Sequence, residues 1–495
     1  MKRFKKAVAF TLCAAMLTGL AACGGDNKST TASGGGETTA ASGGGETTAA
    51  SGGNDTTAPS GGGNYASVND VPAAAETRTI KIGTWYDHFY DSTMSGIDVN
   101  PNVTDPERDQ KMFDNLKEVE QKYNVKIEFV NLTWDGIQES INTSILAGKP
   151  DCDIYEADVT FAVPAVANGY VQKLDDVIPA DANLLNGQEI FAKADAGLEG
   201  NYLFLSNSGE TQVAGTYMLA FNTKMLKDAG LEDPNVLFEK GEWTWDKYRE
   251  YLQKLTQDTN GDGVTDVYGY DSRPDFLVDL LLMSNGTTIA GGATENLSSK
   301  EVGECLDFIN TMYNVDKTAR PWIAADDSYD DHTYSYFDGK CASWITAAWI
   351  SATNNKNDAA ELGADFETWV PFPIGPSGNA ETNGRKKTSS GNVWFIPTGV
   401  EDPAFVYTVF EAWQNWYKND YAYRDADMTW WEDAACNEAN YKVMEWTGEA
   451  GNFDLWNALG VDYQWPALMM GEKTPAQIQE EGKQLLQTAL DQMYK

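Results

Sequence analysis

Arg78-Thr79-Ile80-Lys81-Ile82-Gly83 alternates polar and apolar side chains, which predicts a β-strand at the start of the folded chain. The same alternation over residues 125–132 predicts a second strand, and Asp153-Ile154-Tyr155 predicts a third. Helices are expected between these strands, one opened by Asp105-Pro106 and one over residues 134–146. Strands that alternate with helices indicate an α/β lobe with a largely parallel sheet.

The same pattern continues toward the C-terminus. A helix capped by Thr244 is expected to bury Trp245, Tyr248, Leu252 and Leu255. A capping box of Thr474 and Gln477 predicts a final helix with an apolar face of Ile478, Leu485, Ala489 and Met493. Residues 79–495 exceed what one hydrophobic core usually serves, so the sequence predicts two lobes.

The N-terminus carries a secretion signal. Four basic residues precede a short apolar run that ends in Leu20-Ala21-Ala22-Cys23, and this pattern predicts a signal peptide over residues 1–22. The ending resembles the bacterial lipobox, which predicts a lipid on Cys23. The alternative is an ordinary signal peptide with a chance cysteine. Since this run is too short for a transmembrane helix and no later stretch is long and apolar enough, the lipid is expected to be the only membrane attachment.

Residues 23–78 are of low complexity, with the phrase TTAASGGGE at residues 38–46 repeated nearly unchanged from Thr47. Gly, Ser, Thr and Ala bury too little apolar surface to fold, so this lipidated N-terminus and linker are expected to be disordered. A lipid followed by a long tether suits the outer face of the cell membrane, at a Gram-positive cell surface.

The chain is strongly acidic. It has 36 Lys and Arg residues against 74 Asp and Glu residues, a net charge of −38. The signal peptide removes four basic residues and no acidic ones, which leaves 32 − 74 = −42 for the mature chain. Such a charge argues against nucleic acid as a partner.

Cysteine and histidine are scarce. The mature chain keeps Cys152, Cys305, Cys341 and Cys436 beside Cys23, without a CxxC pair, so a zinc site is not expected. Two disulfides and four buried thiols are both compatible with this spacing. With only His88 and His332, metal catalysis through imidazole is not expected either.

Residues 258–266, DTNGDGVTD, resemble most of an EF-hand calcium loop. The twelfth position is Gly269 rather than glutamate, so the match is incomplete. A plain Asn-Gly or Asp-Gly turn is the alternative. The interpretation favoured here is a structural Ca²⁺ held by Asp258, Asn260, Asp262, the Val264 carbonyl and Asp266.

Aromatic residues suggest a ligand. The chain has 16 Trp, 23 Tyr and 19 Phe, and flat aromatic faces suit the apolar faces of sugar rings. Most of these aromatic residues are expected to lie in the hydrophobic core. Those at strand ends and in glycine-rich loops are the candidates for ligand contact. The candidate ligand-binding residues are Trp85, Tyr86, Glu156, Asp158, Trp349 and Trp394.

Several segments, in order, resemble an extracellular solute-binding protein of the carbohydrate-uptake type, akin to maltodextrin-binding protein. The resemblance covers the chain from Thr79 onward and departs from the family at Phe221-Asn222-Thr223. Its landmarks are KIGTW (81–85), AGKPDCDIYEAD (147–158), NGYVQKLDD (168–176), TYMLAFNTKMLKDAGL (216–231), GEWTWDKYREYLQKLT (241–256), FDGKCASWITAAWIS (337–351), PFPIGPSGN (371–379) and MMGEKTPAQIQEEGKQLLQTALD (469–491).

This resemblance implies a type II periplasmic-binding-protein-like α/β fold, with a hinge and a ligand cleft between two lobes. It places residues 79–215 and 376–418 in the N-lobe, and residues 216–375 and 419–495 in the C-lobe. It also implies capture of a mono- or oligosaccharide and delivery to the permease of an ABC importer, with Trp349 under a sugar ring and Trp85 in the cleft.

Two other classes stay open. A secreted glycoside hydrolase needs two carboxylates at a fixed separation beside a sugar cleft, and no motif here pairs two of the many acidic residues. No nucleophile–histidine set is recognisable, so the chain is not expected to be an enzyme. A surface sensor or adhesin without a transporter is the third class.

Overall fold

The computed structural model describes residues 65–88, 90–100, 103, 105–183, 190–191, 200–204, 217–322, 329–347, 365–379, 392–425, 437–448 and 454–494. The predicted signal peptide, Cys23, Trp349 and Cys436 lie outside these residues. Within the described part of the chain, no helix combines the length and the apolar character needed to cross a membrane.

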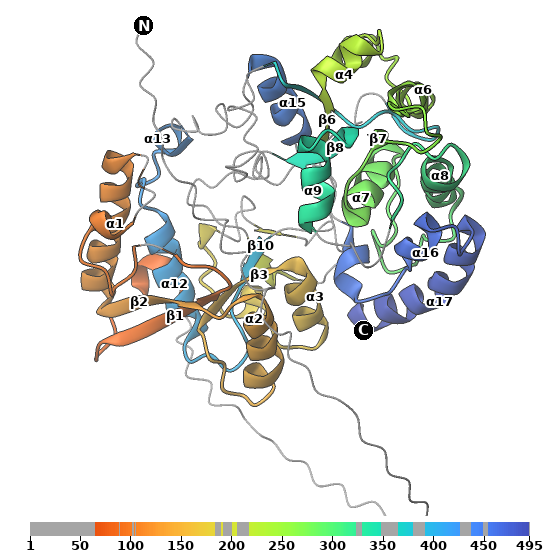
Figure 1. The fold of residues 1–495 in the computed structure, drawn as a ribbon. Helices are drawn as coiled ribbons and strands as arrows, with labels where there is room; N and C mark the ends of the chain where they lie inside the picture. Colours follow the sequence, from red (N-terminus) through yellow and green to blue (C-terminus); the bar gives the residue numbers. More distant parts are fainter. Residues whose placement is uncertain are drawn as a thin grey trace, which may run out of the picture.

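A six-stranded sheet in the order β2-β1-β3-β10-β5-β4 forms the centre of the first lobe (Figure 1). β1 runs parallel to β2 and β3, whereas β10 is antiparallel to β3 and β5. The strands are β1 (Arg78–Thr84), β2 (Val125–Asn131), β3 (Ile154–Asp158), β4 (Ile190–Phe191), β5 (Leu203–Phe204) and β10 (Asn392–Phe395).

Helices cover this sheet. Helix α1 begins where the Asp105 carboxylate accepts the amide protons of Glu107 and Arg108, as its sequence predicts, and it packs against α12. The helices of this lobe are η2 (Val68–Asp70), η3 (Ile97–Val99), α1 (Pro106–Tyr123), α2 (Trp134–Ser140), η4 (Ile141–Ile145), α3 (Val159–Ala167), η5 (Leu174–Asp176), α12 (Pro403–Gln414) and α13 (Tyr421–Asp425).

A four-stranded sheet in the order β7-β8-β6-β9 forms the centre of the second lobe. β7 runs parallel to β8, and β6 is antiparallel to β8 and β9. The strands are β6 (Tyr217–Asn222), β7 (Tyr268–Tyr270), β8 (Cys341–Ala347) and β9 (Glu367–Val370).

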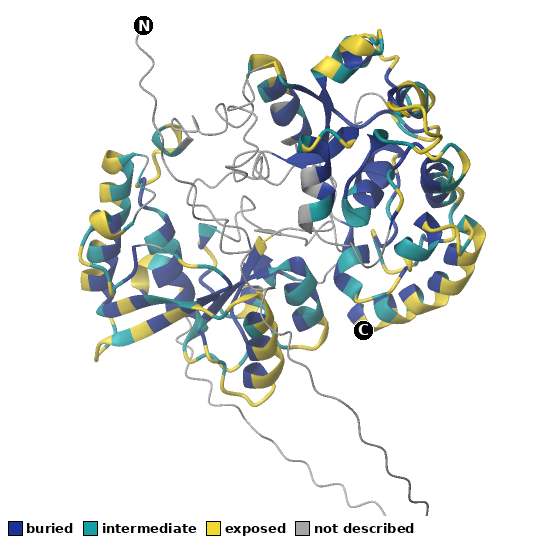
Figure 2. Cartoon of the chain, in the orientation of Figure 1, coloured by how far each residue is buried: buried dark blue, intermediate teal, exposed yellow. Residues whose placement is uncertain are grey.

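The helices of the second lobe surround this sheet, and Figure 2 shows that the strands are its most deeply buried elements. The predicted cap at Thr244 and the predicted capping box at Thr474 are both present. The helices are α4 (Thr223–Asp228), α5 (Pro234–Glu239), α6 (Trp245–Leu255), α7 (Pro274–Ser284), α8 (Lys300–Asn310), η8 (Thr311–Val315), α9 (Tyr329–Phe337), α15 (Glu438–Gly448), η10 (Leu455–Leu459), α16 (Trp465–Met469) and α17 (Pro475–Met493).

The chain passes between the lobes three times, after β5, after β9 and after α13, because β10 returns to the first sheet and α15 packs on β9 of the second. Helix α3 of the first lobe packs against η10 and α17, which joins the lobes on that side. The two-lobed α/β architecture predicted from the sequence is therefore confirmed. The exact residues at which each lobe begins and ends stay predictions, except at residues 78/79 and 418/419.

The folded body begins before residue 79, contrary to the prediction of a linker up to residue 78. Val71 is buried, the Tyr65 hydroxyl donates to Asp402 at 3.1 Å, and the Val68 amide donates to Asp181 at 2.9 Å. The segment from Tyr65 onward thus packs on the first lobe, because Tyr65, Val68 and Ala74 contact its core.

The boundary predicted at residues 418/419 is placed too early. The ammonium group of Lys111 in α1 lies 3.7 Å from the ring centroid of Tyr423, and Lys418 donates to Asn115 at 2.6 Å. Helix α13 is therefore attached to the first lobe.

The buried face of α17 also differs from the prediction. Leu485 is 57% exposed, and the buried residues are Ile478, Gly482, Leu486, Leu490 and Met493. A Cβ at Gly482 would lie 2.6 Å from Leu297 Cδ2, so glycine allows close approach of the helix at the centre of this face.

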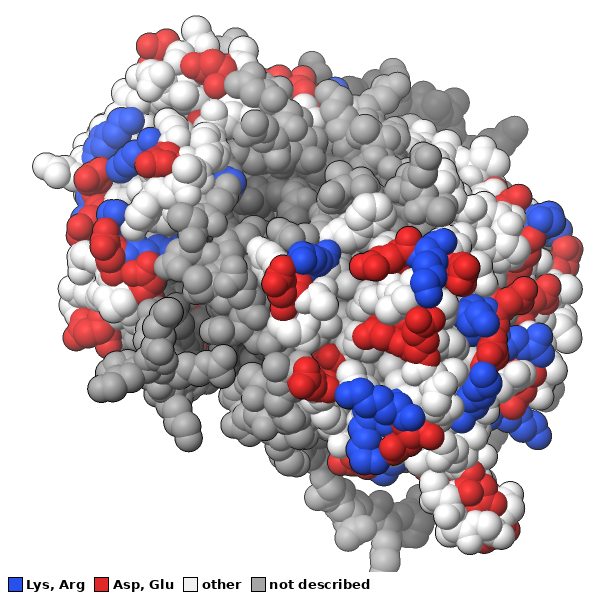
Figure 3. Space-filling model, turned by 90° about the horizontal axis from the view of Figure 1, so that it is seen from above, with Lys and Arg blue, Asp and Glu red and all other residues white. Residues whose placement is uncertain are grey.

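Acidic and basic side chains are interspersed over the described surface seen in Figure 3. Many pair along one helix, such as Lys254 with Glu250 at 2.7 Å and Lys442 with Glu438 at 2.7 Å. Such exposed pairs contribute little to stability, so the surface charge bears on solubility rather than on fold.

Candidate ligand-binding site

The carboxyl ends of β1, β2 and β3 meet at one edge of the first sheet, since Thr84 pairs with Asn131 and Gly83 with Tyr155 in parallel register. Ligands of open α/β sheets bind outside the carboxyl ends of the strands. Side chains that follow these strands are therefore the first candidates for ligand contact.

Four aromatic side chains line this edge and are here called the aromatic edge: Trp85, Tyr86, Trp134 and Phe161. The Trp85 ring lies edge-on to Tyr86 and Trp134, with centroids 5.4 and 5.5 Å away, and Trp134 lies 4.6 Å from Phe161. Trp134 is 46% exposed, whereas Trp85 is 7% exposed. The edge thus presents one accessible indole face supported by a more buried ring.

Trp85 also carries an unused donor. Its Nε1 is buried and has no hydrogen-bond partner among the described residues. An unpaired buried N–H costs about 1–3 kcal/mol, which a ligand oxygen or a water would offset.

Glu156 sits beneath this edge and is 2% exposed. The Tyr86 hydroxyl lies 2.9 Å from both of its carboxylate oxygens, and Nε2 of His88 lies 3.0 Å from Oε2. His88 in turn stacks on Phe129 at 4.3 Å. Both carboxylate oxygens therefore contact residues of the loop after β1. The side chain of Glu156 supports Tyr86 and His88 and does not face solvent.

The other predicted residues are placed differently. Asp158 caps α3 by accepting from the Thr160 amide at 2.8 Å. Trp394 is 3% exposed and packs 5.0 Å from Phe410, which favours the core alternative for this tryptophan. Trp349 lies outside the described residues.

Sequence reasoning missed His88, Trp134 and Phe161. Trp134 was visible as the first residue of a predicted helix directly after a strand, which places it at the same edge as Trp85. Phe161 and His88 gave no such signal, because their positions depend on α3 and on the loop after β1.

The predicted calcium loop is exposed and closed by its own polar groups. Asp258 accepts from the amides of Gly261 and Gly263 at 2.7 and 2.8 Å. Bonds from the Thr259 hydroxyl and amide hold the pKa of Asp266 below its usual value. Within the described ranges, no group of three or more His, Cys, Asp or Glu side chains is arranged to hold a metal. The oxygen-rich loop fits the chemistry of a Ca²⁺ ligand set, and the ion stays a prediction.

Three of the cysteines are buried free thiols: Cys152, Cys305 and Cys341. Burial raises the pKa of the Cys152 thiol to about 12 and that of Cys341 well above its usual value. These thiols are therefore protonated and unreactive at neutral pH.

The sequence matches the family of bacterial extracellular solute-binding proteins over residues 100–415, which is more than half of the chain. The chain belongs to this family. Its members bind solutes, and the two-lobed fold described above is theirs.

Solved structures agree with this assignment at the level of the fold. The GacH receptor of Streptomyces glaucescens, solved unliganded and with acarbose, is 16% identical with a TM-score of 0.54, covering 85% of this chain and 100% of its own. The cyclic alpha-maltosyl-1,6-maltose binding protein of Arthrobacter globiformis is 13% identical with a TM-score of 0.55, covering 83% and 98%.

A third solute-binding protein of similar fold is an ABC substrate-binding protein of Listeria monocytogenes, solved in complex with cycloalternan. It is 14% identical with a TM-score of 0.50, covering 85% of this chain and 100% of its own. A comparison with curated protein sequences found no match.

Proposed function

We propose that this solute-binding protein captures a neutral mono- or oligosaccharide between its lobes and delivers it to the permease of an ABC importer. The observation that carries the proposal is the aromatic edge at the carboxyl ends of β1 and β2. The names of the three similar structures, which refer to acarbose, cyclic alpha-maltosyl-1,6-maltose and cycloalternan, support a carbohydrate.

The physical reason is the hydration of sugars. Hydrogen bonds to a sugar replace hydrogen bonds to water at a small net gain, so affinity must come largely from ring faces buried against aromatic side chains. Trp134 offers such a face, with Trp85 behind it at 5.5 Å. Closure of the second lobe over this face would complete the site, because the ligand favours the closed population.

The proposal includes the cell-surface location. A diacylglyceryl group on Cys23 would hold the protein at the outer face of the membrane, and a Ca²⁺ bound by residues 258–266 would stabilise the second lobe. The protein is proposed to bind its solute without chemical turnover.

The test is titration of the mature chain with maltose, maltotriose, mannobiose and mannotriose by calorimetry. The wild type should bind at least one of these sugars. Replacing Trp134 with Ala should weaken that binding roughly tenfold, about 1.4 kcal/mol, with little loss of stability since the side chain is half exposed. Tyr421, exposed on α13, provides the control variant Tyr421→Ala, which should bind as the wild type does.

Three outcomes would contradict the proposal. The first is a wild-type protein that binds none of these sugars. The second is Trp134→Ala with unchanged affinity, which removes the aromatic edge as the site. The third is release of cleaved sugar during the titration, which would favour a glycoside hydrolase instead.

A further inference from the structure

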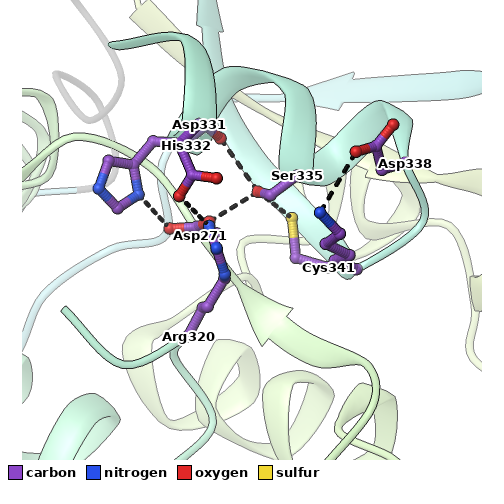
Figure 4. Close-up of polar contacts among 8 residues, drawn as sticks. Asp271, Arg320, Asp331, His332, Ser335, Asp338 and Cys341 are labelled. Carbon is purple, nitrogen blue, oxygen red and sulfur yellow. Dashed lines mark hydrogen bonds and ion pairs between the residues drawn. The ribbon is translucent and has the colours of Figure 1, made fainter. Parts of the chain in front are cut away.

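A buried polar network lies at the carboxyl end of β7 in the second lobe (Figure 4). Its centre is the carboxylate of Asp271, the residue after β7, which is 0% exposed. Three groups bond to it: Nη1 of Arg320 at 2.9 Å, the Ser335 hydroxyl at 2.6 Å and Nδ1 of His332 at 2.7 Å. This carboxylate therefore holds α9, which carries His332 and Ser335, against the sheet.

In this network one guanidinium bridges two carboxylates. Nη1 of Arg320 bonds to Asp331 at 2.8 Å as well as to Asp271. Burial opposes the positive charge of Arg320, but the bonds to Asp331 and Asp271 outweigh that effect and raise the pKa of the guanidinium. Since Asp271 accepts from both Arg320 and Ser335, Nδ1 of His332 is assigned as a further donor to it.

The Trp322 ring stacks on this histidine. The two rings are parallel within 2° with centroids 4.4 Å apart, and each residue is 4% exposed. Nε1 of Trp322 and Nε2 of His332 are both buried, and neither has a hydrogen-bond partner within the part of the chain that the structure describes. Two unsatisfied nitrogens on stacked rings are unusual in a protein interior and call for an external partner.

The pair is attached to the second sheet through Asp271, which directly follows the carboxyl end of β7 and lies beside Ser343 of β8. In Figure 1, α9 lies on the side of the second lobe that is turned toward the first lobe.

We propose that Trp322 and His332 form a second-lobe subsite that binds one hydroxyl group of the captured sugar. This inference rests on the proposed function. The Trp322 indole N–H can only donate, and Nε2 of His332 accepts when the ring proton is on Nδ1. A hydroxyl group does both at once, whereas a carboxylate cannot donate and an ammonium group cannot accept. Asp271 is the positioning residue that fixes this tautomer.

The test compares three variants of the mature chain, with the sugar that the wild type binds most tightly in the titration described above. Trp322→Phe keeps the stacked ring and removes the donor. His332→Asn keeps an amide donor for Asp271 and removes Nε2 at the far end of the ring, a position that the shorter amide oxygen does not reach. Trp465→Phe is the matched control, because Nε1 of Trp465 on α16 is equally buried and has no partner among the described residues.

Each of the first two variants should bind the sugar about 3- to 10-fold more weakly, the range for one lost hydrogen bond to a neutral group. Without sugar, the melting temperature of Trp322→Phe should be equal to or above that of the wild type, since the removed N–H has no protein partner. A merely structural role would lower that melting temperature. Trp465→Phe should bind as the wild type does.

The subsite is refuted if Trp322→Phe and His332→Asn bind with unchanged affinity while Trp134→Ala binds more weakly, and the proposed function then survives. A melting temperature of Trp322→Phe that falls with affinity unchanged refutes it as well, because an internal water then satisfies the indole. A wild-type protein that binds no sugar overturns both proposals together.

Discussion

Nε2 of His88 lies 3.0 Å from Oε2 of Glu156, a carboxylate that is almost completely buried. The two residues come from the loop after β1 and from β3, so the pair fixes the loop that carries Tyr86 to the neighbouring strand. The Tyr86 hydroxyl donates to the same carboxylate at 2.9 Å. Glu156 therefore holds the side chains of Tyr86 and His88 in place.

Replacing Glu156 with Gln should lower the free energy of unfolding by about 1–3 kcal/mol, because a buried amide cannot accept from both partners as the carboxylate does. Sugar affinity should fall about 3- to 10-fold as Tyr86 loses its support. Urea unfolding and calorimetry measure the two effects. Glu139→Gln, on the exposed face of α2, should change neither. Wild-type stability in Glu156→Gln would contradict the supporting role.

Glu367 predicts a pH dependence of stability. Burial raises its pKa from 4.5 to about 7, even though Trp369 Nε1 donates to it at 2.8 Å. The folded state therefore binds a proton more tightly than the unfolded state. The stability from this proton is fully present below about pH 4.5 and is lost as the pH rises through about 7, with an amplitude on the order of 3 kcal/mol.

Glu367→Gln should remove this component, so that the variant gains stability relative to the wild type as the pH rises from 4.5 to 8. Urea unfolding at intervals across that range measures the difference. Glu239→Gln, an exposed residue of the same lobe, should follow the wild type. Parallel curves for Glu367→Gln and the wild type would show that Glu367 has an ordinary pKa.

Calcium should stabilise the protein through residues 258–266. A ligand that binds only the folded state adds about 2.7 kcal/mol at a hundredfold excess over its dissociation constant. Calcium should therefore raise the melting temperature, a chelator should lower it, and Asp262→Ala should abolish the difference. Asp228→Ala, an exposed carboxylate on α4, should keep the response. A wild-type melting temperature that changes with neither calcium nor chelator would rule out the ion.

Cys23 should carry the lipid. In the producing cell, Cys23→Ala should release the protein into the medium or leave the precursor uncleaved, because the acceptor thiol is missing. Cys13→Ala serves as the control, since that cysteine lies inside the predicted signal peptide. Mass spectrometry that finds an unmodified mature N-terminus at another residue would exclude this anchor.

Short sequence patterns predicted the starts of helices correctly. Asp105, Thr244 and Thr474 each cap the helix that the sequence predicted, because a cap depends only on its own few residues. The face of α17 was missed because Gly482 lies at its centre and contributes no side chain to the apolar pattern, so Leu485 was chosen over Leu486.

Long-range pairing explains the rest. Residues 65–77 look like the end of a linker, and long-range contacts such as those with Asp181 and Asp402 show that they belong to the body. The network around Asp271 joins residues 49 to 64 positions apart, so no local pattern marks it. By contrast, Trp85 and Tyr86 were found because the end of a parallel strand is itself a local signal.

The segment of residues 65–71, which packs on the first lobe, also determines which lobe takes up a force applied to the chain on its N-terminal side. It is fastened to the first lobe at Asp181, through both the Ser67 hydroxyl at 2.7 Å and the Val68 amide at 2.9 Å. A load applied to the chain before residue 65 is therefore transmitted to the first lobe. Under the lobe closure proposed above, such a load would not oppose the movement of the second lobe.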